Sequence, residues 1–253
     1  MRVVKVRNLT IGEGRPKICV PIVGVTKQEI LSQAEKLREV PAEIVEWRAD
    51  WFEGVRDMEQ VKDVLRSLWE VLGELPLLFT FRTKAEGGEK EIDEEAYRAL
   101  NLAVIQSGGA DLVDVEIFRG EACAKEIIEE AHVFGVHVIA SNHDFAKTPE
   151  KEEIIRRLRY MQEMDADILK IAVMPNSKKD VLTLLAATEE MSRKYADRPL
   201  VTMSMGGDGA ISRMGGEIFG SAITFGTAGQ ASAPGQMEAK ELKKVLDMIH
   251  KVV

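Results

Sequence analysis

VHVIASNHDFAKTPEKEEIIRRLRYMQEMDADILKIAV, residues 136–173, is the stretch of sequence that decides the fold. It begins and ends with short apolar runs, 136–143 and 167–173, which are typical of strands buried on both faces of a parallel sheet. Between the two runs lies one apolar stripe at helical spacing, formed by Ile154, Ile155, Leu158 and Met161. The stretch therefore predicts a strand, a helix and a second strand in direct succession.

The start of this helix is predicted from its capping residues. Thr148 is a typical N-cap, Pro149 suits the first helical position, and Glu150 is an acidic residue in the first turn. We therefore expect the helix to begin at Pro149.

The same alternation recurs along the rest of the chain. Further short runs rich in Val, Ile, Leu and Phe lie at 17–24, 43–48, 76–82, 111–117, 199–205 and 222–226. Together with helical stretches between them, these eight runs predict a single (β/α)8 TIM-barrel domain over residues 1–253. A doubly wound sheet is the alternative, but no G-x-G-x-x-G fingerprint follows the first run.

The opening segment, VVKVRNLTIGEG at residues 3–14, has a different periodicity from the runs that follow it. Apolar and polar residues alternate with period two, and the segment ends in a turn that contains glycine. It therefore predicts a short N-terminal β-hairpin before the barrel, which would close the bottom of the barrel.

Composition and charge limit the class of protein. The net charge of −8 disfavours nucleic acid as a partner, and no run approaches the roughly 20 apolar residues that a membrane span needs. The first ten residues contain no apolar signal segment, and Cys19 and Cys123 lie in separate apolar segments as small hydrophobic residues. We therefore expect a cytoplasmic protein with a small-molecule ligand and neither a membrane nor a nucleic-acid partner.

Polar residues interrupt the apolar runs near their carboxyl ends, where barrel enzymes have their active sites. Because side chains two apart share a face of a strand, several of these residues are expected to point inward together. The polar residues near these strand ends are Glu46, Arg48, Asp50, Arg82, Asp114, Glu116, Ser141, Asn142, His143 and Lys170. Asp114 and Glu116 can be interpreted in two ways at this point. They could belong to a functional site, or they could neutralise the arginines in a purely structural network. The other histidines, His132, His137 and His250, have no polar cluster around them and are expected to be structural or exposed.

Lys170 is the exception among these residues, since apolar residues surround it within a predicted buried strand. A buried lysine is costly unless it finds a partner or loses its proton. A deprotonated amine is a nucleophile for carbonyl groups, so this position suggests imine chemistry. A structural ion pair explains the same residue equally well at this point.

Two loops add polar groups at the same end of the predicted barrel. Glu86 and the Gly87-Gly88 pair follow Arg82 closely, and a second small, polar loop at 226–236 has glycines near its ends. The second loop could act as a lid through which Ser232 and Gln236 reach a ligand. Ordinary solvated connections are the alternative for both loops.

Six stretches carry a resemblance to a known family. They are EWRAD (46–50), LLFTFRTKAEGGE (77–89), SNHDF (141–145), KIAVMP (170–175), SMGGDGAISR (204–213) and QASAPGQ (230–236). On these stretches the chain resembles the type I 3-dehydroquinate dehydratases over essentially its whole length. The resemblance implies a (β/α)8 barrel that removes water from 3-dehydroquinate through a lysine Schiff base, giving 3-dehydroshikimate in the shikimate pathway. It also implies that neither a metal nor an organic cofactor is needed, and that the protein is a homodimer.

The resemblance further implies a role for each site residue. Lys170 corresponds to the Schiff-base lysine, His143 to the general acid/base, and Glu86 to the acidic residue that orients the histidine. The substrate carboxylate would be held by Arg213, Ser232 and Gln236. The ring hydroxyls would be bound by Glu46, Arg48 and Arg82, and the apolar lining would consist of Met203, Met205 and Phe225. This chain departs from many relatives at Pro21, where they have a small polar residue, so a hydroxyl contact from that position is in doubt.

Three other functions remain as alternatives. A class I aldolase on the same barrel would use the same lysine to cleave a carbon–carbon bond. A metal-dependent barrel would use Glu46, Asp50, Asp114, Glu116 and His143, although the arginines and the lysine between them disfavour a dication. A non-catalytic barrel would leave the grouping of base, nucleophile and carboxylate-binding residues unexplained.

Overall fold

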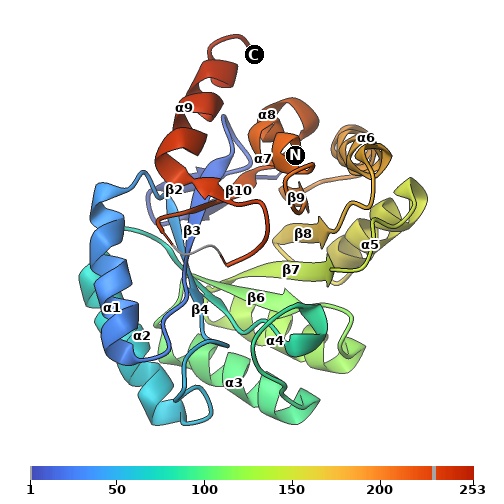
Figure 1. Ribbon diagram of the computed structural model, residues 1–253. Helices are drawn as coiled ribbons and strands as arrows, with labels where there is room; N and C mark the ends of the chain where they lie inside the picture. Colours follow the sequence, from blue (N-terminus) through green and yellow to red (C-terminus); the bar gives the residue numbers. More distant parts are fainter. Residues whose placement is uncertain (1, 230–231) are drawn as a thin grey trace.

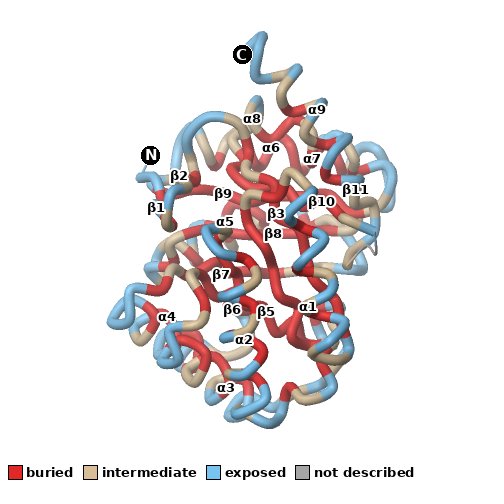
Figure 2. The backbone as a smooth tube through the Cα atoms, turned by 90° about the vertical axis from the view of Figure 1, so that its left-hand side faces the viewer, coloured by how far each residue is buried: buried red, intermediate tan, exposed pale blue. Residues whose placement is uncertain are grey.

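The structure is a computed structural model that describes residues 2–229 and 232–253. Parallel strands at its centre are surrounded by helices that follow them in chain order (Figure 1). The strands are buried almost throughout, whereas the helices expose their outer faces (Figure 2). This arrangement explains why the strand runs are continuously apolar, because each strand packs against side chains on both faces.

The sheet order is β11-β10-β3-β4-β5-β6-β7-β8-β9. Its strands are β3 (Lys17–Ile22), β4 (Ile44–Arg48), β5 (Leu77–Thr80), β6 (Leu112–Glu116), β7 (His137–Asp144), β8 (Ile168–Val173), β9 (Leu200–Ser204), β10 (Ile223–Thr227) and the short β11 (Met237–Glu238). A backbone hydrogen bond from Ala222 N to Leu200 O, 2.7 Å long, joins β10 to β9 and closes the sheet into a barrel. The predicted (β/α)8 barrel is therefore confirmed, with strand limits within two residues of those expected.

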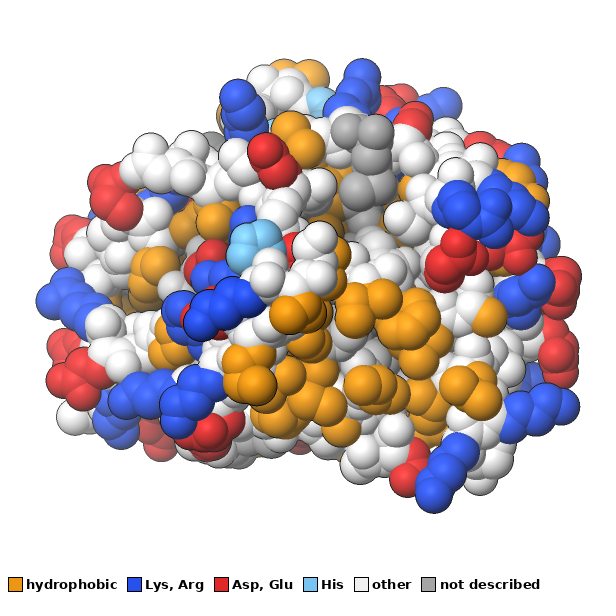
Figure 3. All heavy atoms as spheres, turned by 90° about the horizontal axis from the view of Figure 1, so that it is seen from above, with side chains coloured by type: hydrophobic (Ala, Val, Ile, Leu, Met, Phe, Trp, Pro, Cys, Tyr) orange, Lys and Arg blue, Asp and Glu red, His pale blue; other side chains and the backbone are white. Residues whose placement is uncertain are grey.

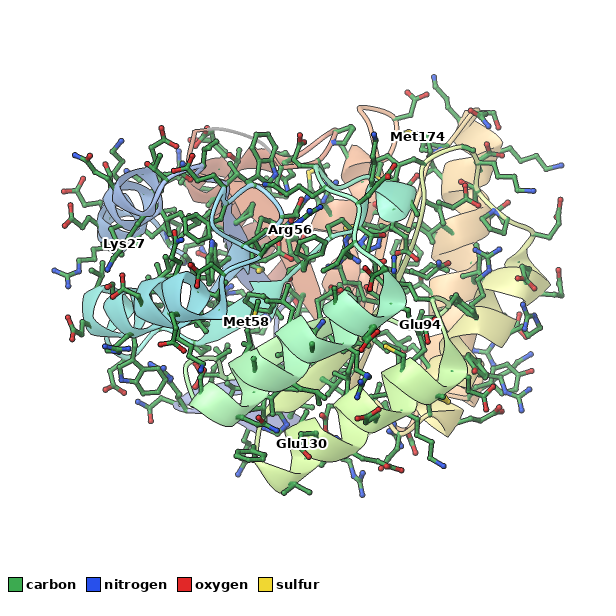
Figure 4. The ribbon with its side chains drawn as sticks, turned by 90° about the horizontal axis from the view of Figure 1, so that it is seen from below. Lys27, Arg56, Met58, Glu94, Glu130 and Met174 are labelled. Atoms are coloured by element: carbon green, nitrogen blue, oxygen red, sulfur yellow. The ribbon has the colours of Figure 1, made fainter. Side chains whose placement is uncertain are left out.

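The helices pack around the barrel. They are α1 (Lys27–Lys36), α2 (Met58–Leu72), α3 (Glu94–Ser107), α4 (Glu121–Val133), α5 (Lys151–Glu163), α6 (Lys178–Lys194), α7 (Ala210–Met214), α8 (Gly216–Phe219) and α9 (Ala239–His250), with short 3₁₀ turns η1 (Leu37–Glu39) and η2 (Lys84–Glu86). Several begin at residues that cap their free amides, including capping boxes at Thr26 and Ser177. Adjacent helices run parallel, as Figure 4 shows for α3 and α4, where Glu94 and Glu130 lie at opposite ends of the pair.

The predicted start of α5 was wrong. The helix begins at Lys151 with Glu150 as its N-cap residue, so Thr148 and Pro149 precede it. The Thr148 hydroxyl donates instead to the carbonyl of Met174, at 3.0 Å. The hydroxyl therefore attaches the connecting segment to the end of β8 and is not available to cap the helix.

The N-terminal hairpin consists of β1 (Val4–Val6) and β2 (Leu9–Ile11), paired antiparallel as predicted. Its apolar side chains belong to the same cluster as the residues that fill the barrel near the amino ends of the strands. Members of this cluster include Val4, Val6, Ile11, Cys19, Ile44, Leu112 and Ile168. The hairpin thus covers the bottom of the barrel and leaves the opposite end for a site.

Two further expectations concern single residues. Cys19 and Cys123 are buried and unpaired, as expected. Pro21 lies on β3 just beyond Cys19, where the register between β3 and β10 ends. Because proline has no amide hydrogen, it fits a position where one neighbouring ladder has stopped.

No helix in the described part of the chain is long and apolar enough to cross a membrane.

Candidate active site

A pocket of about 470 Å³, counting its open mouth, lies at the carboxyl ends of the strands. Its lining includes the twelve residues to which the family resemblance gives a role, namely Glu46, Arg48, Arg82, Glu86, His143, Lys170, Met203, Met205, Arg213, Phe225, Ser232 and Gln236. The other polar residues expected near the strand ends, Asp50, Asp114, Glu116, Ser141 and Asn142, are not part of the lining. Strands, and the segments that follow them, contribute these residues from distant parts of the sequence because the barrel brings the carboxyl ends of all its strands to one face. The remaining histidines, His132, His137 and His250, are not part of the lining.

Lys170 lies on β8 and is almost completely buried, with 3% of its surface exposed. Its Nζ is 2.9 Å from Asp114 Oδ2, 3.9 Å from Glu46 Oε1 and 4.6 Å from the centroid of the Phe225 ring. Burial opposes ionisation of Asp114, but Arg82 and Lys170 together lower its pKa to about 2. The lysine is therefore held by a carboxylate on one side while its amine lines the pocket, so the ion-pair interpretation and the nucleophile interpretation are compatible.

Glu86 and His143 form a second unit in the pocket wall. Oε2 of Glu86 accepts hydrogen bonds of 2.9 Å from both the backbone amide and the Nδ1 atom of His143. Burial raises the pKa of Glu86 to about 8, while burial and then the cations Arg82, Lys170 and Arg48 lower the pKa of His143. The two groups consequently titrate as a pair. When the pair holds one proton, that proton lies on Nδ1 of His143, and Nε2 is free to act as a base. When the pair holds a second proton, Nε2 carries it, and His143 can act as an acid.

Two glycines allow Glu86 to reach this position. Gly87 ends the turn η2 with a φ of 85°, a conformation that favours glycine, and a Cβ at this position would lie 2.2 Å from the Phe145 ring. A Cβ on Gly88 would lie 1.9 Å from the carbonyl oxygen of Arg82. The Gly87-Gly88 pair therefore folds the loop tightly enough to point Glu86 at His143.

Arg48 and Arg82 are fixed by buried carboxylates. Arg48 forms two hydrogen bonds of 2.8 Å to Asp50, and Arg82 contacts Asp114 at 2.8 Å and Glu116 at 3.0 Å. Burial disfavours the charge of Arg82, but these carboxylates raise its pKa overall. Both guanidinium groups stay charged and hold a defined orientation toward the pocket.

Arg213 differs from the other cations in the pocket. It is 1% exposed, and its described hydrogen bonds go only to neutral groups, Met203 Sδ at 3.7 Å and the Pro234 carbonyl at 3.1 Å. Among the described residues, no carboxylate lies within ion-pair distance of it, and its Nε has no hydrogen-bond partner. Burial lowers its pKa to about 10, so it still carries its charge at neutral pH. A buried charge of this kind provides a binding site for an anion.

The loop after β10 reaches the same part of the pocket. Gln236 Nε2 donates to Ser232 Oγ at 3.0 Å, and the Ser232 amide donates to Gln236 Oε1 at 2.9 Å. The Ser232 carbonyl lies 3.4 Å from Arg48 Nη1. Gln230 and Ala231, the first two residues of the QASAPGQ stretch, lie outside the described residues.

Sequence reasoning missed three residues of the lining. These are Phe145, Ala172 and Ala233. Phe145 follows His143 by two positions, so the period-two rule could have indicated that both face the pocket. Pro21 is not part of the lining.

The carboxylates that a metal site would need are engaged by other groups. Asp50 binds Arg48, Glu116 binds Arg82 and Thr83, and Glu46 accepts a 2.9 Å hydrogen bond from the Thr80 hydroxyl. In the described ranges, no group of three or more His, Cys, Asp or Glu side chains is arranged to hold a metal ion. The geometry therefore favours organic acid/base chemistry with a buried amine.

Comparisons with known proteins point to one family. A family model described as type I 3-dehydroquinase matches residues 18–252. The chain is 54% identical over 252 residues to the 3-dehydroquinate dehydratase of Clostridioides difficile, covering 100% of this chain and 99% of that protein. It is 57% identical over 249 residues to the enzyme of the same name from Clostridium botulinum, covering 98% of both.

The solved structures agree with the sequence relatives. A crystal structure of the type I 3-dehydroquinate dehydratase from Clostridioides difficile, described as carrying covalently modified comenic acid, has a TM-score of 0.97 to this chain. It is 54% identical and covers 100% of this chain and 99% of its own. The similarity extends over the barrel and the N-terminal hairpin together.

Proposed function

The chain belongs to the type I 3-dehydroquinase family, and from this premise we propose how its own residues carry out the reaction. It is a hydro-lyase that converts 3-dehydroquinate to 3-dehydroshikimate in the shikimate pathway, through a Schiff base as is general for type I enzymes. The observation that carries the residue assignment is the buried Lys170 amine, which lines a pocket together with a Glu86–His143 pair.

The first step is formation of an imine. The Lys170 amine adds to the ketone carbon of the substrate, and water leaves as the carbon–nitrogen double bond forms. Asp114, 2.9 Å from Nζ, orients the lysine and stabilises the positive charge of the protonated imine. The imine then serves as an electron sink for the next step.

The second step is elimination of the β-hydroxyl group. Nε2 of His143 removes a proton from the carbon between the imine and the leaving group, giving a neutral enamine. The enamine electrons then expel the hydroxyl, which takes the proton from His143 and leaves as water. Hydrolysis of the conjugated imine releases the product and restores the Lys170 amine.

Substrate binding divides between two sets of polar residues. Arg213 supplies two parallel donors to the substrate carboxylate, and Ser232 and Gln236 complete that subsite from the loop. The ring hydroxyls bind Glu46, Arg48 and Arg82, and the apolar faces of the ring contact Met203, Met205 and Phe225. Support for this division comes from the buried charge of Arg213, which lacks an anionic partner in the described part of the chain.

The experiment that tests these roles is reductive trapping. Incubation with 3-dehydroquinate and borohydride should add the mass of the reduced ligand to the peptide that contains Lys170. His143→Ala should still give this adduct while turnover, followed by ultraviolet absorbance of the conjugated product, falls by about 10² to 10⁴. An adduct on a different lysine, or a His143→Ala variant with more than about a tenth of normal turnover, would contradict the assignment. A class I aldolase would instead cleave a carbon–carbon bond and release two smaller products, which mass spectrometry would detect.

We also propose that the protein is one catalytic domain, acts in the cytoplasm without cofactor and forms a homodimer. The continuous barrel, which family similarity covers from residue 18 to 252, supports a single domain. Sedimentation equilibrium distinguishes a dimer from the 28.1 kDa monomer.

A further inference from the structure

A chain of hydrogen bonds connects the outside of the barrel to the acid/base pair. α5 packs on the outer face of the barrel beside β8 (Figure 1). From this helix, Arg157 Nη1 donates to Asn142 Oδ1 at 2.9 Å, and Asn142 Nδ2 donates to Glu86 Oε1 at 3.1 Å. The other oxygen of Glu86 accepts from His143 Nδ1 at 2.9 Å. Arg157 thus reaches His143 through two residues without lining the pocket itself.

The direction of these bonds follows from the chemistry of arginine. A guanidinium group has donors only, so Arg157 selects the oxygen of the Asn142 side-chain amide. The amide nitrogen must then face Glu86, where its hydrogens stabilise a carboxylate. Without Arg157, the amide could rotate and turn its oxygen toward Glu86, and this contact would repel the carboxylate. Asn142 is 8% exposed, so water has little access to replace the lost bond.

We propose that Arg157 and Asn142 are positioning residues for the proton transfer, which hold the Glu86 carboxylate in the orientation that presents His143 to the substrate. The inference rests on the proposed roles of Glu86 and His143. Neither Arg157 nor Asn142 lines the pocket, so their loss should affect the proton-transfer step and leave substrate binding nearly unchanged.

The charges around Glu86 determine how pH reports on this arrangement. The groups that face the Glu86–His143 pair are Arg48 on β4, Arg82 after β5, Asp114 and Glu116 on β6, and Lys170 on β8. Burial raises the pKa of Glu86, and the Asn142 hydrogen bond lowers it. Loss of that bond therefore raises the pKa further, so the base form of the pair appears only at higher pH. The acid limb of the kcat profile should move upward.

The chain supplies a matched control on the same helix. Arg156 and Arg157 both pair with Glu153 at 2.7 Å, but only Arg157 contacts Asn142. We expect Arg157→Met to lower kcat by about tenfold, as losses of orienting residues do at metal sites, with KM within about twofold. Its acid limb should rise by about one pH unit, the size of one hydrogen bond to a charged group. Arg156→Met should match the wild type in kcat and in pH profile.

Two further variants guard against a simple loss of structure. Arg157→Lys keeps a charged donor and should recover at least half of the wild-type kcat. Asn142→Leu should reproduce the kinetic defect of Arg157→Met, and the double variant should be no worse than Asn142→Leu alone, because both changes remove one shared contact. Thermal unfolding and borohydride trapping at Lys170 verify that each variant is folded and forms the imine.

The proposal is overturned if Arg157→Met keeps the wild-type kcat and acid limb, or if Arg156→Met shows the same defect. Multiplicative effects in the double variant would also contradict it, since they indicate two independent contributions. These results differ from a failure of the proposed site, in which the wild-type protein itself would give no adduct at Lys170.

Discussion

Two buried cations in the pocket illustrate how a residue's partners indicate its function. The Nζ atom of Lys170 lies 2.9 Å from a carboxylate oxygen of Asp114, which holds the lysine in place. Arg213 is equally buried, but its described hydrogen bonds go to a thioether and a carbonyl. Burial of an arginine without a carboxylate is unfavourable unless the ligand supplies one. We therefore expect the substrate carboxylate to complete the ionic pairing of the pocket.

Arg213→Lys tests this pairing. The change keeps the charge but removes the planar pair of donors that matches a carboxylate, so we expect KM to rise by about tenfold or more. Because Lys170 and His143 are untouched, borohydride should still trap the adduct. An unchanged KM would mean that the carboxylate binds elsewhere.

The loop that follows β10 is the element with the clearest link to binding. Its described part packs Ser232 against Gln236 and places the Pro234 carbonyl on Arg213. Gly229 and Gly235, with φ angles of 125° and 76°, lie near its two ends. The loop at 226–236 that the sequence suggests as a lid includes Gln230 and Ala231, which lie outside the described residues.

We predict that amide hydrogen exchange in the peptide containing residues 232–236 slows severalfold when a product-like ligand binds. The reason is that Arg213 would exchange its bond to the Pro234 carbonyl for the ligand carboxylate while Ser232 and Gln236 close over it. The α5 helix serves as an internal reference whose exchange should not change. Equal exchange of the loop in both states would rule out its role as a lid.

The N-terminal hairpin carries a titratable contact of its own. His137 Nε2 lies 3.0 Å from the Lys5 carbonyl, and Nδ1 lies 3.6 Å from Asp167, which also contacts His132 at 3.1 Å. The nearby Asp167 carboxylate raises the pKa of His137, burial opposes this, and Asp111 adds a smaller upward effect. Since only the protonated ring donates from both nitrogens, the charged form holds the hairpin best.

A raised pKa in the folded state fixes the sign of the pH dependence. The contribution of His137 to stability is fully present below the unfolded pKa of about 6.5 and disappears as pH rises through the higher folded value. We therefore expect His137→Gln to lower Tm by about 1–2 °C more at pH 6 than at pH 9, a small effect because the ring is partly exposed. His250→Gln, which removes a histidine that contacts Glu217, is the control. A Tm difference independent of pH would contradict the assignment.

The sequence predicted strands better than helix ends and contacts between elements. Strands buried on both faces produce apolar runs that can be read directly, and Lys170 stood out because such a run contained it. The start of α5 could not be predicted, since only the folded chain brings Thr148 to the Met174 carbonyl. Arg157 looks like any solvated charge on a helix, and its contact with Asn142 depends on how α5 packs against the barrel.

At the scale of the whole molecule, an acidic protein binds an anionic substrate. The net charge is −8, and the face in Figure 3 shows side chains of both signs around an apolar area. Long-range repulsion of the substrate should be screened by salt, whereas pairing with the buried Arg213 should be screened much less. We therefore expect KM to fall by about twofold as ionic strength rises from about 0.01 to 0.15 M, with kcat unchanged. A KM that rises severalfold would mean that exposed cations dominate binding.

The junction between β9 and β10 has a consequence for how the molecule folds and unfolds. All other neighbouring barrel strands share a ladder within the described residues, but this pair is joined by one short bridge around Leu200 and Ser221. Closing it brings together the two ends of the rolled sheet, so we expect it to form late in folding and to open early in unfolding. Met203 and Met205 lie on one side of the junction, and Phe225 lies on the other, all within the pocket. We therefore expect a bound substrate to bridge the part of the barrel that forms last and to slow its opening, which would couple occupancy of the site to the kinetic lifetime of the fold.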